Sequence, residues 1–366
     1  MLAPVSGWFD PAPKGGFLRL AAHSYLPAKG DPQVRLPGLR RGDLVALADG
    51  RVVSVNGAAP EQARERPEFA KLGAVHPSRA LVLETPSASS PRTAAIHRVM
   101  DLVCPLGFGQ RALIVSPPKA GKTVILQAIA EAVALNHPAA VLLILLVDER
   151  PEEVSEMVDW GRGEVIASSF DLPHERHVAV GEMVFEHARR RVEMGQDVVI
   201  VLDSLTRLAR SHNTAGRSTR RTLSGGLDAG ALAAPKALFG AARAVPGGGS
   251  LTVIATALIE TESKMDDVIF EEFKGTGNAE LRLVRALADR RIYPAVDIDA
   301  SGTRREELLG DPATVAGRQL LRRTLAGRPP EQAMDALLAQ IRRTKTNAEL
   351  LRSLQPSAIS RQQADR

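Results

Sequence analysis

Ser-Pro-Pro-Lys-Ala-Gly-Lys-Thr at residues 116–123 is the stretch of this chain that decides its fold. An apolar run, Ala112–Val115, precedes it, and a run with helical character, Val124–Ala130, follows it. Strand, tight loop and helix in this order is the setting in which a Gly-Lys-Thr loop binds nucleotide phosphates. The N–H groups at the start of the helix and the helix dipole both attract anions. The stretch therefore predicts a site for ATP or GTP.

Two residues of this loop have expected tasks. Lys122 is expected to reach the β- and γ-phosphates, and the Thr123 hydroxyl is expected to bind Mg²⁺. The usual pattern begins with Gly where this chain has Ser116, and Ser fits only if the backbone there needs no positive φ. The alternative is an ordinary strand-to-helix turn with a surface lysine, which the flanking pattern disfavours.

Composition sets broad limits on the function. The chain has 366 residues, which is enough for two domains, and its 44% apolar content is that of a globular protein. A net charge of +5 suits a polyanionic partner such as nucleic acid, although an ordinary basic protein has the same balance. The single cysteine, Cys104, permits no intramolecular disulfide and predicts a reducing compartment, with Cys104 as a small core residue.

The sequence gives no sign of a membrane or of secretion. Met1–Asp10 lacks the basic head and long apolar stretch of a signal peptide. The longest apolar run, Ala139–Val147, is too short to span a bilayer and is expected to be a buried strand. We expect a cytoplasmic protein with no membrane partner.

The chain divides into two parts by pattern. Residues 1–84 carry short apolar bursts broken by Gly and Pro, which predict a small β-barrel or open sheet; the bursts are Gly16–Leu20, Asp43–Leu47 and Arg51–Val55. A polar stretch rich in Ser and Pro follows, so residues 85–95 are expected to be a linker. Residues 96–354 alternate between strand and helix patterns, and residues 355–366 form a polar tail.

The second part predicts an α/β domain with a mostly parallel sheet that is covered by helices on both faces. Four continuous apolar runs are expected to be its buried strands: Ala112–Val115, Val141–Val147, Val198–Leu202 and Leu251–Ala257. An amphipathic helix is expected over Glu182–Met194, and the last helix is expected to run from about Pro330 to Leu354.

Two carboxylates follow predicted strands, at the sheet edge where open α/β sheets bind ligands. Asp203 comes directly after Val198–Leu202 and is expected to hold Mg²⁺, directly or through water. Glu149 follows the strand after the phosphate loop and is expected to activate the attacking water as a general base. The alternatives are a helix N-cap for Asp203 and a solvated acidic turn for Glu149.

A third cluster, Ser301–Glu307, contains Arg304 after a flexible Ser-Gly pair. An arginine in such a setting suits an arginine finger, which neutralises charge on a transferring phosphoryl group. Taken alone the signal is weak, because two Arg before two Glu commonly form a solvated helix start.

Several blocks together resemble the bacterial transcription termination factor Rho family. They are residues 117–123, 148–153 (Asp-Glu-Arg-Pro-Glu-Glu), 201–210, 271–278 (Glu-Glu-Phe-Lys-Gly-Thr-Gly-Asn), 301–304 and 344–347 (Thr-Lys-Thr-Asn). The resemblance covers roughly residues 8 to 354. It implies a RecA-like, ring-shaped homohexamer that hydrolyses ATP between subunits, moves along single-stranded RNA as a helicase and ends transcription by RNA polymerase.

The resemblance also assigns roles to individual residues. It implies that Glu149, Lys122, Arg304 and Asp203 are catalytic, that Arg304 acts on the neighbouring subunit, and that Thr123 and Asp203 hold Mg²⁺. The nucleotide site it implies consists of Pro118, Lys119, Ala120, Gly121, Lys122, Thr123, Val124, Arg150, Arg207, Arg291 and Tyr293. Within this set, Tyr293 is expected to lie against adenine, because a stacked ring is physically sensible there.

Two loops are expected, by resemblance, to line a central pore. One covers residues 223–232 and ends at Lys236; the other contains Lys274, Gly275 and Thr276. Glycines let the backbone approach a strand and move, and Lys236 and Lys274 supply charge for phosphates.

The first domain resembles the family's cold-shock-like (OB) RNA-binding module, with Phe17, Arg19 and Tyr25 as RNA-binding residues. The family has two aromatics around a glycine, whereas this chain has Gly15 in place of the first ring. The segment between Tyr25 and Gly42 is short, and the family's N-terminal helical bundle is expected to be absent. We expect an RNA site that is weaker or differently selective, and Phe17 and Tyr25 are alternatively plain core aromatics.

Three rival functions share parts of the pattern. A RecA-like recombinase binds DNA in open filaments, and a rotary ATP synthase catalytic subunit shares the core fold and the finger. A non-catalytic RNA-binding protein keeps the fold without turnover, but the intact Lys122, Glu149, Asp203 and Arg304 disfavour it.

Overall fold

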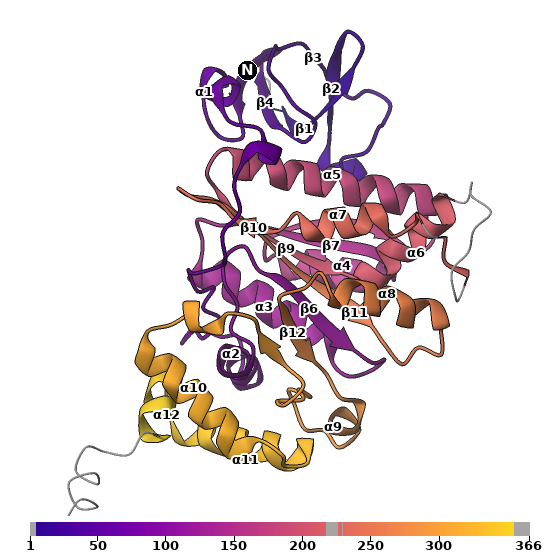
Figure 1. The fold of residues 1–366 in the computed structure, drawn as a ribbon. Helices are drawn as coiled ribbons and strands as arrows, with labels where there is room; N and C mark the ends of the chain where they lie inside the picture. The colour runs from indigo at the N-terminus through magenta and orange to yellow at the C-terminus, as the bar shows by residue number, and fades with distance from the viewer. Residues whose placement is uncertain (1–4, 217–225, 229, 355–366) are drawn as a thin grey trace, which may run out of the picture.

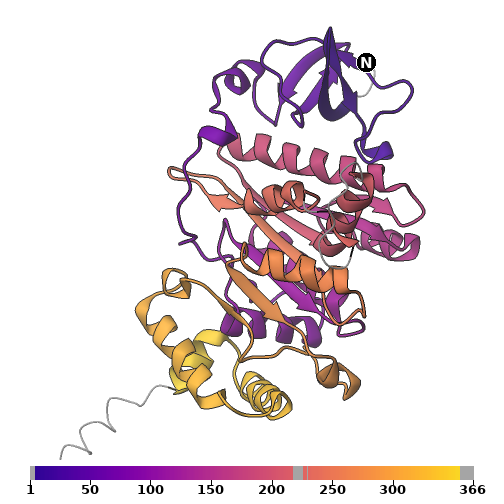
Figure 2. The same cartoon turned by 45° about the vertical axis from the view of Figure 1, so that its right-hand side comes forward.

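The computed structural model describes residues 5–216, 226–228 and 230–354. The small N-terminal domain and the C-terminal helices lie at opposite ends of a large sheet domain (Figures 1 and 2). The expected polar tail at residues 355–366 lies outside the described residues, as do 223–225 and 229 of the first expected pore loop.

The first domain is an antiparallel five-stranded sheet with the order β3-β2-β1-β4-β5. Its strands are β1 (Val5–Ala12), β2 (Gly15–Arg19), β3 (Gln33–Val34), β4 (Leu44–Ala48) and β5 (Arg51–Val55). The three predicted bursts are β2, β4 and β5, and the sheet fits the predicted OB-like domain. The sequence pattern missed β1, which contains Gly7 and Pro11, and β3, which has only two residues.

The segment between the two domains is more ordered than a linker. After α1 (Pro60–Glu65) and a 3₁₀ turn, η2 (Phe69–Lys71), the chain runs down one side of the large domain, where Val75 forms a β-bridge with Ala244 (Figure 1). Helix α2 (Pro91–Val103) begins inside residues 85–95, so the expectation of a linker there is wrong for its second half. The Ser90 side chain accepts a hydrogen bond from the Thr93 N–H and caps this helix, with Pro at its first turn.

The large domain is built on an eight-stranded sheet. Seven strands have the order β13-β12-β6-β11-β9-β7-β8, and the eighth, β10, pairs with β11. The pairs among β12, β6, β11, β9, β7 and β8 are parallel, and β13 and β10 pair antiparallel. The strands are β6 (Arg111–Ser116), β7 (Val141–Glu149), β8 (Glu164–Ser169), β9 (Asp197–Asp203), β10 (Arg243–Ala244), β11 (Ser250–Leu258), β12 (Ala279–Arg282) and β13 (Gly302–Thr303). The four predicted strands are confirmed within two residues at each end, and the mostly parallel sheet is confirmed.

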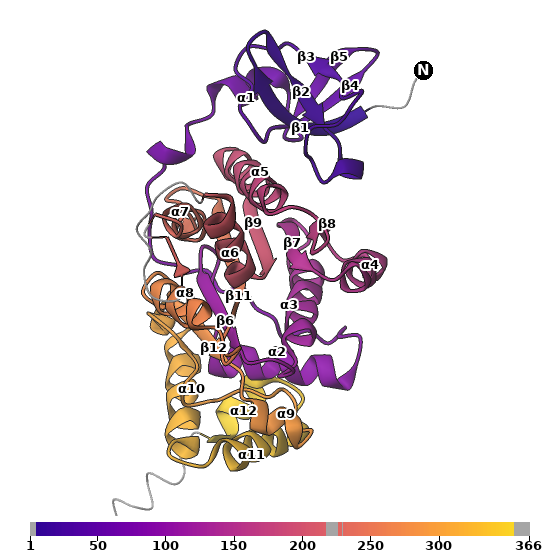
Figure 3. The ribbon, with the colours of Figure 1, turned by 90° about the vertical axis from the view of Figure 1, so that its right-hand side faces the viewer.

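Strand side chains alternate between two apolar cores, as the pleat requires. Val199 and Val201 of β9 face one core, which α2, α3 and the C-terminal helices cover. Val198, Ile200 and Leu202 face the other, which α5 to α8 cover. The helices therefore lie on both faces of the sheet (Figure 3).

The helices of the large domain follow the predicted alternation with strands. Their bounds are α3 (Lys122–Asn136), α4 (Pro151–Trp160), α5 (His174–Glu193), α6 (Leu205–Ala215), α7 (Ala233–Gly240), α8 (Lys264–Lys274), α9 (Arg285–Asp289), α10 (Pro312–Leu325), α11 (Pro330–Arg343) and α12 (Asn347–Leu354). Helix α5 starts eight residues before the expected Glu182, directly after Pro173. None of the helices in the described ranges combines the length and apolar character needed to cross a bilayer.

The expectation of one last helix from Pro330 to Leu354 is wrong, because the chain is extended at Thr344. The buried guanidinium of Arg98 donates hydrogen bonds to the carbonyl oxygens of Ile341 (2.8 Å) and Thr344 (2.6 Å). It also donates to the Asn347 side chain at 3.0 Å. The contact between Arg98 and Asn347, 249 residues apart, thus fixes the break between α11 and α12. A prediction from helical periodicity cannot include a contact this distant in sequence.

The first domain docks on α5 through stacked rings. Trp8 is fully buried, with its ring centroid 3.6 Å from that of Tyr25 and 4.2 Å from that of His187. The Tyr25 hydroxyl donates to the Glu164 carboxylate. Burial lowers the pKa of His187 to about 3, so its ring is neutral and Nδ1–H donates to the Gly42 carbonyl oxygen at 2.8 Å.

A buried ion network ties the same domains together. Arg66 lies 2.7 Å from Asp43 in the first domain and 2.9 Å from Glu193 on α5, and its side chain is 2% exposed. The Phe69 N–H also donates to Glu193 at 2.8 Å. Buried charges cost several kcal/mol unless they are paired, so this network holds the two domains in one orientation.

Gly15 is a site where the backbone demands glycine. Its φ is +118°, and a Cβ added there would lie 2.7 Å from the Val34 carbonyl oxygen and from the Arg35 side chain. Gly50 in the β4–β5 turn also has a positive φ, +75°, but has no atom within 4 Å of an added Cβ. The aromatic residue that the family has at this position therefore cannot be introduced at Gly15 without a steric clash.

We predict that Gly15→Ala lowers the free energy of unfolding by about 2 kcal/mol or more, because it adds a backbone clash to conformational strain. The matched control Gly50→Ala, which has strain alone, is expected to cost about 1 kcal/mol. Chemical denaturation of both variants measures the difference. Equal losses would show that the clash is relieved and the argument from Gly15 is wrong.

Candidate active site

The phosphate loop joins β6 to α3 and has the expected form. Lys119 (φ +66°) and Gly121 (φ +93°) take left-handed conformations, and Lys122 begins the helix. Ser116 is not among the described residues with positive φ, so the chain does not need Gly there. Pro118 and Lys119 are exposed whereas Ala120 is 2% exposed, which leaves the outer side of the loop open to a ligand.

Lys122 lies between the two predicted carboxylates. Its Nζ is 3.1 Å from Glu149 Oε1 and 2.6 Å from Asp203 Oδ1. Glu149 ends β7 and Asp203 ends β9, so the parallel strands deliver both acids to the carboxyl edge of the sheet. Thr256 of β11, which sequence reasoning missed, donates to Asp203 Oδ1 at 2.8 Å and fixes that carboxylate.

The charges of this triad shift its protonation equilibria. Burial and the neighbouring Asp203 charge raise the pKa of Glu149 to about 7, against the opposing effect of Lys122 and Arg207. Burial lowers the pKa of Lys122, but Asp203 and Glu149 more than offset this, so its pKa is raised overall. A carboxylate that titrates near neutral pH suits a general base.

Arg207 lies beside the triad and Arg150 stands apart from it. Arg207 Nε is 3.4 Å from Glu149 Oε1, and its Nη1 donates to the Asp148 carbonyl oxygen. The Ser204 side chain accepts a hydrogen bond from the Arg207 N–H and caps α6, which places Arg207 in the first turn of that helix. Arg150 is largely exposed at the start of α4, with Nε 4.0 Å from Glu153 Oε1, so it is accessible to a ligand.

Tyr293 borders the phosphate loop, where the adenine was expected. A Cβ built on Gly121 would lie 3.8 Å from the Tyr293 ring. The Arg92 guanidinium lies 4.3 Å from the centre of that ring, a cation–π contact that sequence reasoning missed. Val124 is partly buried against the core, and Arg291 is exposed with φ +60°.

Arg304 is not part of this edge. It follows β13, where Thr303 pairs with Ala279, which in turn pairs with Ala112 at the amino end of β6. Ala112 and Ser116 are about 13 Å apart along the strand. The phosphate loop begins only after Ser116, so Arg304 lies at the opposite edge of the sheet, beyond the reach of its own loop.

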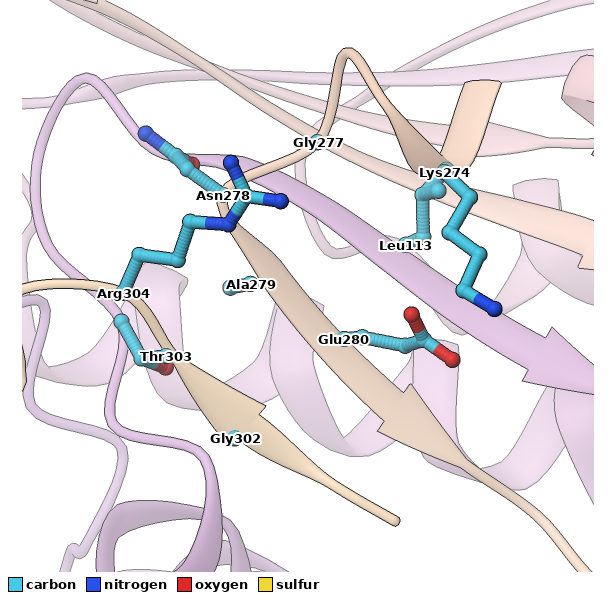
Figure 4. Close-up of a pocket in the computed structure, with 9 residues that line it drawn as sticks. All are labelled: Leu113, Lys274, Gly277, Asn278, Ala279, Glu280, Gly302, Thr303 and Arg304. Atoms are coloured by element: carbon cyan, nitrogen blue, oxygen red, sulfur yellow. The ribbon is translucent and has the colours of Figure 1, made fainter. Parts of the chain in front are cut away.

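The second expected pore loop and Arg304 line one hollow of about 310 Å³ (Figure 4). In it, the Lys274 side chain points toward the Glu280 carboxylate, and the Arg304 guanidinium extends toward Asn278 (Figure 4). Lys274 ends α8, and Gly275 and Thr276 follow it.

Asn278 connects the second expected pore loop with Arg304. Its side-chain oxygen accepts hydrogen bonds from Gln110 Nε2 (2.7 Å) and the Arg111 N–H (2.8 Å), and its backbone carbonyl accepts from the Arg304 N–H (2.9 Å). Asn278 thus lies two residues after Thr276 and is hydrogen-bonded directly to the backbone of Arg304. Asn278 belongs to the motif at residues 271–278, but the sequence alone does not predict its hydrogen bond to Arg304.

Lys236, the other expected pore lysine, lies on α7. Its Nζ is 2.8 Å from Glu272 of α8, and both side chains are exposed. Helices α7 and α8, which carry the two lysines, cover the same face of the sheet (Figure 3).

The three expected RNA-binding residues of the first domain have different environments. Phe17 is half-buried on β2, and the Arg19 guanidinium lies 5.2 Å from the centre of its ring. Arg19 pairs with Asp10 (2.7 Å) and Asp31 (2.8 Å), which neutralise it. Tyr25 is 7% exposed and stacked on Trp8, which favours the alternative of a core aromatic for this residue.

Comparison with known proteins separates the candidate families. The nucleotide-binding domain of the ATP synthase alpha/beta family matches residues 97–303. Transcription termination factor Rho from Streptosporangium roseum is 50% identical over 96% of this chain and 92% of its own length. The same factor from Streptomyces coelicolor is 52% identical over 94% of this chain and 84% of its own length.

The chain belongs to the Rho family. The Rho protein of Gemmatimonas aurantiaca is 56% identical over 96% of this chain, but the chain spans only half the length of that relative. An ATPase from the type III secretion system of pathogenic bacteria is similar in fold, with a TM-score of 0.63 and 20% identity over 79% of this chain and 89% of its own. The Rho family assignment confirms the resemblance seen in the sequence, and the fold match confirms the RecA-like α/β class.

The site of this Rho-family chain fits ATP and Mg²⁺. The N-terminus of α3 and the left-handed turn at Lys119 and Gly121 form a cradle for phosphates. Across the described ranges, no group of three or more His, Cys, Asp or Glu side chains could hold a metal ion by itself. Mg²⁺ in nucleotide sites is usually held by one or two protein oxygens plus substrate phosphates, which Asp203 and Thr123 could provide.

We predict that Glu149→Gln changes the pH dependence of stability. Glu149 has a pKa of about 7 when folded, against an ordinary value of 4.5, so its ionisation destabilises the folded state as pH rises between these values. The free energy of unfolding of Glu149→Gln, relative to the natural chain, is expected to grow by up to about 1.4 kcal/mol per pH unit across that window.

Urea unfolding of the nucleotide-free protein from below to above the window measures this. Glu152→Gln, an exposed change on α4, is the control and is expected to follow the natural chain. A flat difference between Glu149→Gln and the natural chain would contradict the raised pKa.

Proposed function

We propose that the chain is an ATP-dependent RNA translocase and helicase that terminates transcription by acting on nascent RNA in the cytoplasm. One observation carries the proposal. The phosphate loop with Glu149 and Asp203 lies at one edge of the sheet, while Arg304 and a pore-loop lysine share a hollow at the other. Membership of the Rho family supports the choice of RNA and polymerase as partners.

The contacts among Lys122, Glu149 and Asp203 suggest how the site rearranges when ATP binds. Without nucleotide, Lys122 neutralises two buried carboxylates. When the phosphates of ATP bind the loop, Lys122 turns to them. Asp203, released from Lys122, and the Thr123 hydroxyl would hold Mg²⁺, which would supply positive charge to the phosphates. Glu149, positioned by Arg207, accepts a proton from the attacking water.

The placement of Arg304 calls for a second subunit. Since Arg304 cannot reach its own phosphate loop, it completes the site only when a neighbouring copy presents its carboxyl edge. Copies that join head-to-tail form a ring where the rotation between them closes and an open filament where it does not. Membership of the Rho family supports the closed form, and we propose the homohexamer. The Asn278 link then couples RNA at Lys274 to the charge that Arg304 delivers next door.

We predict that Arg304→Ala leaves ATP binding nearly intact and lowers the RNA-stimulated ATPase rate by about 10³-fold or more, as expected for a finger. Mixing the variant with the natural chain is expected to lower activity more steeply than the share of natural subunits. Arg305→Ala is the matched control, because Arg305 is exposed and pairs with Glu307 at 2.8 Å. Activity strictly proportional to the natural subunits would contradict action across subunits.

The whole proposal is tested with a stalled RNA polymerase elongation complex, ATP and the purified protein. We expect release of the transcript with the natural chain and none with Lys122→Ala, because the phosphates lose their lysine. RNA-independent ATPase activity, or no transcript release despite RNA-stimulated ATPase, would contradict the proposed function.

A further inference from the structure

Two further hollows extend along the amino edge of the sheet from the first domain. The one nearer to the first domain, of about 620 Å³, lies between η2, α5 and α7 and is lined by Phe69, Arg189 and Arg243. The next, of about 410 Å³, contains Arg243 again together with Arg111 at the start of β6. Arg243 lines both, so the two hollows adjoin at its side chain.

The path continues to the pore loop. Asn278 lines the second hollow and also the hollow of Lys274 and Arg304 shown in Figure 4. Three hollows thus form one amino-edge groove, which begins where the chain leaves the first domain and ends at Lys274. Helix α7, which carries Lys236, forms one wall of its first part.

Three arginines in this groove form no ion pair with any acidic side chain in the part of the chain that the structure describes. Among the ion pairs of the described residues, none includes Arg111, Arg243 or Arg304, whereas Arg189 pairs with Glu186 at 2.5 Å. Burial lowers the pKa of Arg111, and the like charges of Arg243 and Arg304 lower it further. Guanidinium groups do not lose their proton in proteins, so this clustering is a cost that an anion would relieve.

The arginines are also held in place before any ligand arrives. Arg111 donates from Nε to the Thr276 carbonyl oxygen (2.8 Å) and from Nη1 to that of Ala242 (2.9 Å). The Arg243 guanidinium lies 4.7 Å from the centre of the Phe69 ring and donates from Nε to the Ala241 carbonyl oxygen at 3.0 Å. Fixed cations lose less conformational entropy on binding than free ones.

We propose that the amino-edge groove binds the phosphate backbone of single-stranded RNA between the first domain and the pore loop. This rests on the proposed function. Arg111, Arg243 and Arg304 outnumber the one lining acid, Glu280, that enters no ion pair among the described residues. One end of the groove lies at Lys274, which the proposed function assigns to RNA, and the other lies at η2, where the chain leaves the first domain. Acidic side chains of a second copy are the other occupant to test, but they would have to match charges along a path through three hollows.

Salt dependence of RNA binding tests the groove in the full chain. For single strands, each phosphate contact contributes about 0.7 to the slope of log K against log salt. We predict that Arg243→Gln lowers this slope by about 0.7 and that Arg111→Gln with Arg243→Gln lowers it by about 1.4. Arg243→Lys keeps the charge and is expected to keep the slope.

The probe is a fluorescein-labelled oligocytidylate that is long enough to reach the pore, measured by anisotropy with a slowly hydrolysed ATP analogue. Arg342→Gln, at an exposed position on α11 at the far end of the molecule, is the matched control and is expected to match the natural chain. Thermal unfolding and sedimentation of every variant accompany the titrations.

Three results would overturn the proposal. The first is an unchanged slope in both Gln variants, and the second is an equal fall in Arg243→Lys, which would indicate a structural role. The third is an altered sedimentation coefficient with an unchanged slope, which would make the groove a contact between copies. RNA-stimulated ATPase of the natural chain is scored separately, so if it is absent while the slopes shift as predicted, the translocase proposal fails and the groove stands.

Discussion

The ion triad of Lys122, Glu149 and Asp203 is the interaction on which the site depends. Two carboxylates, each less than 5% exposed at the side chain, lie at the ends of adjacent parallel strands, and Lys122 holds them together at 3.1 and 2.6 Å. Such charges are costly when buried unless they are paired. The two carboxylates are tolerated because the Lys122 ammonium lies between them, and in the proposed mechanism this ammonium moves to the phosphates of ATP. In this mechanism, Asp203 can hold Mg²⁺ and Glu149 can contact water only after the phosphates of ATP draw Lys122 away.

Strand β6 relates this site to the rest of the molecule. Its carboxyl end, Ser116, leads into the phosphate loop, and its amino end, Arg111, lies in the amino-edge groove and bonds the pore loop at Thr276. Strand β6 thus lies between the phosphate loop at the carboxyl edge of the sheet and the proposed RNA groove at the amino edge. In the proposed assembly, each subunit would supply the phosphate loop of one ATP site and the Arg304 of the next. The proposal therefore places subunit assembly, RNA contact and ATP hydrolysis at elements joined to strand β6.

Much of this could be predicted from the sequence, because its signals are local. The phosphate loop is contiguous, and the buried strands are unbroken apolar runs, so Glu149 and Asp203 could be placed at one edge from strand order alone. The features that were missed arise from contacts distant in sequence. Arg98 breaks the last helix, Thr256 anchors Asp203, and α5 with Trp8 buries Tyr25. Strands β12 and β13 were missed because four and two residues carry too little periodicity.

A cryo-electron microscopy structure of the protein with a slowly hydrolysed ATP analogue, Mg²⁺ and single-stranded RNA would test the central claim most directly. The account predicts a closed assembly in which Lys122 of one subunit and Arg304 of the next flank the γ-phosphate, with RNA beside Lys274. Nucleotide held by Lys122 with Arg304 facing solvent, or with RNA bound away from the Lys274 loops, would contradict it.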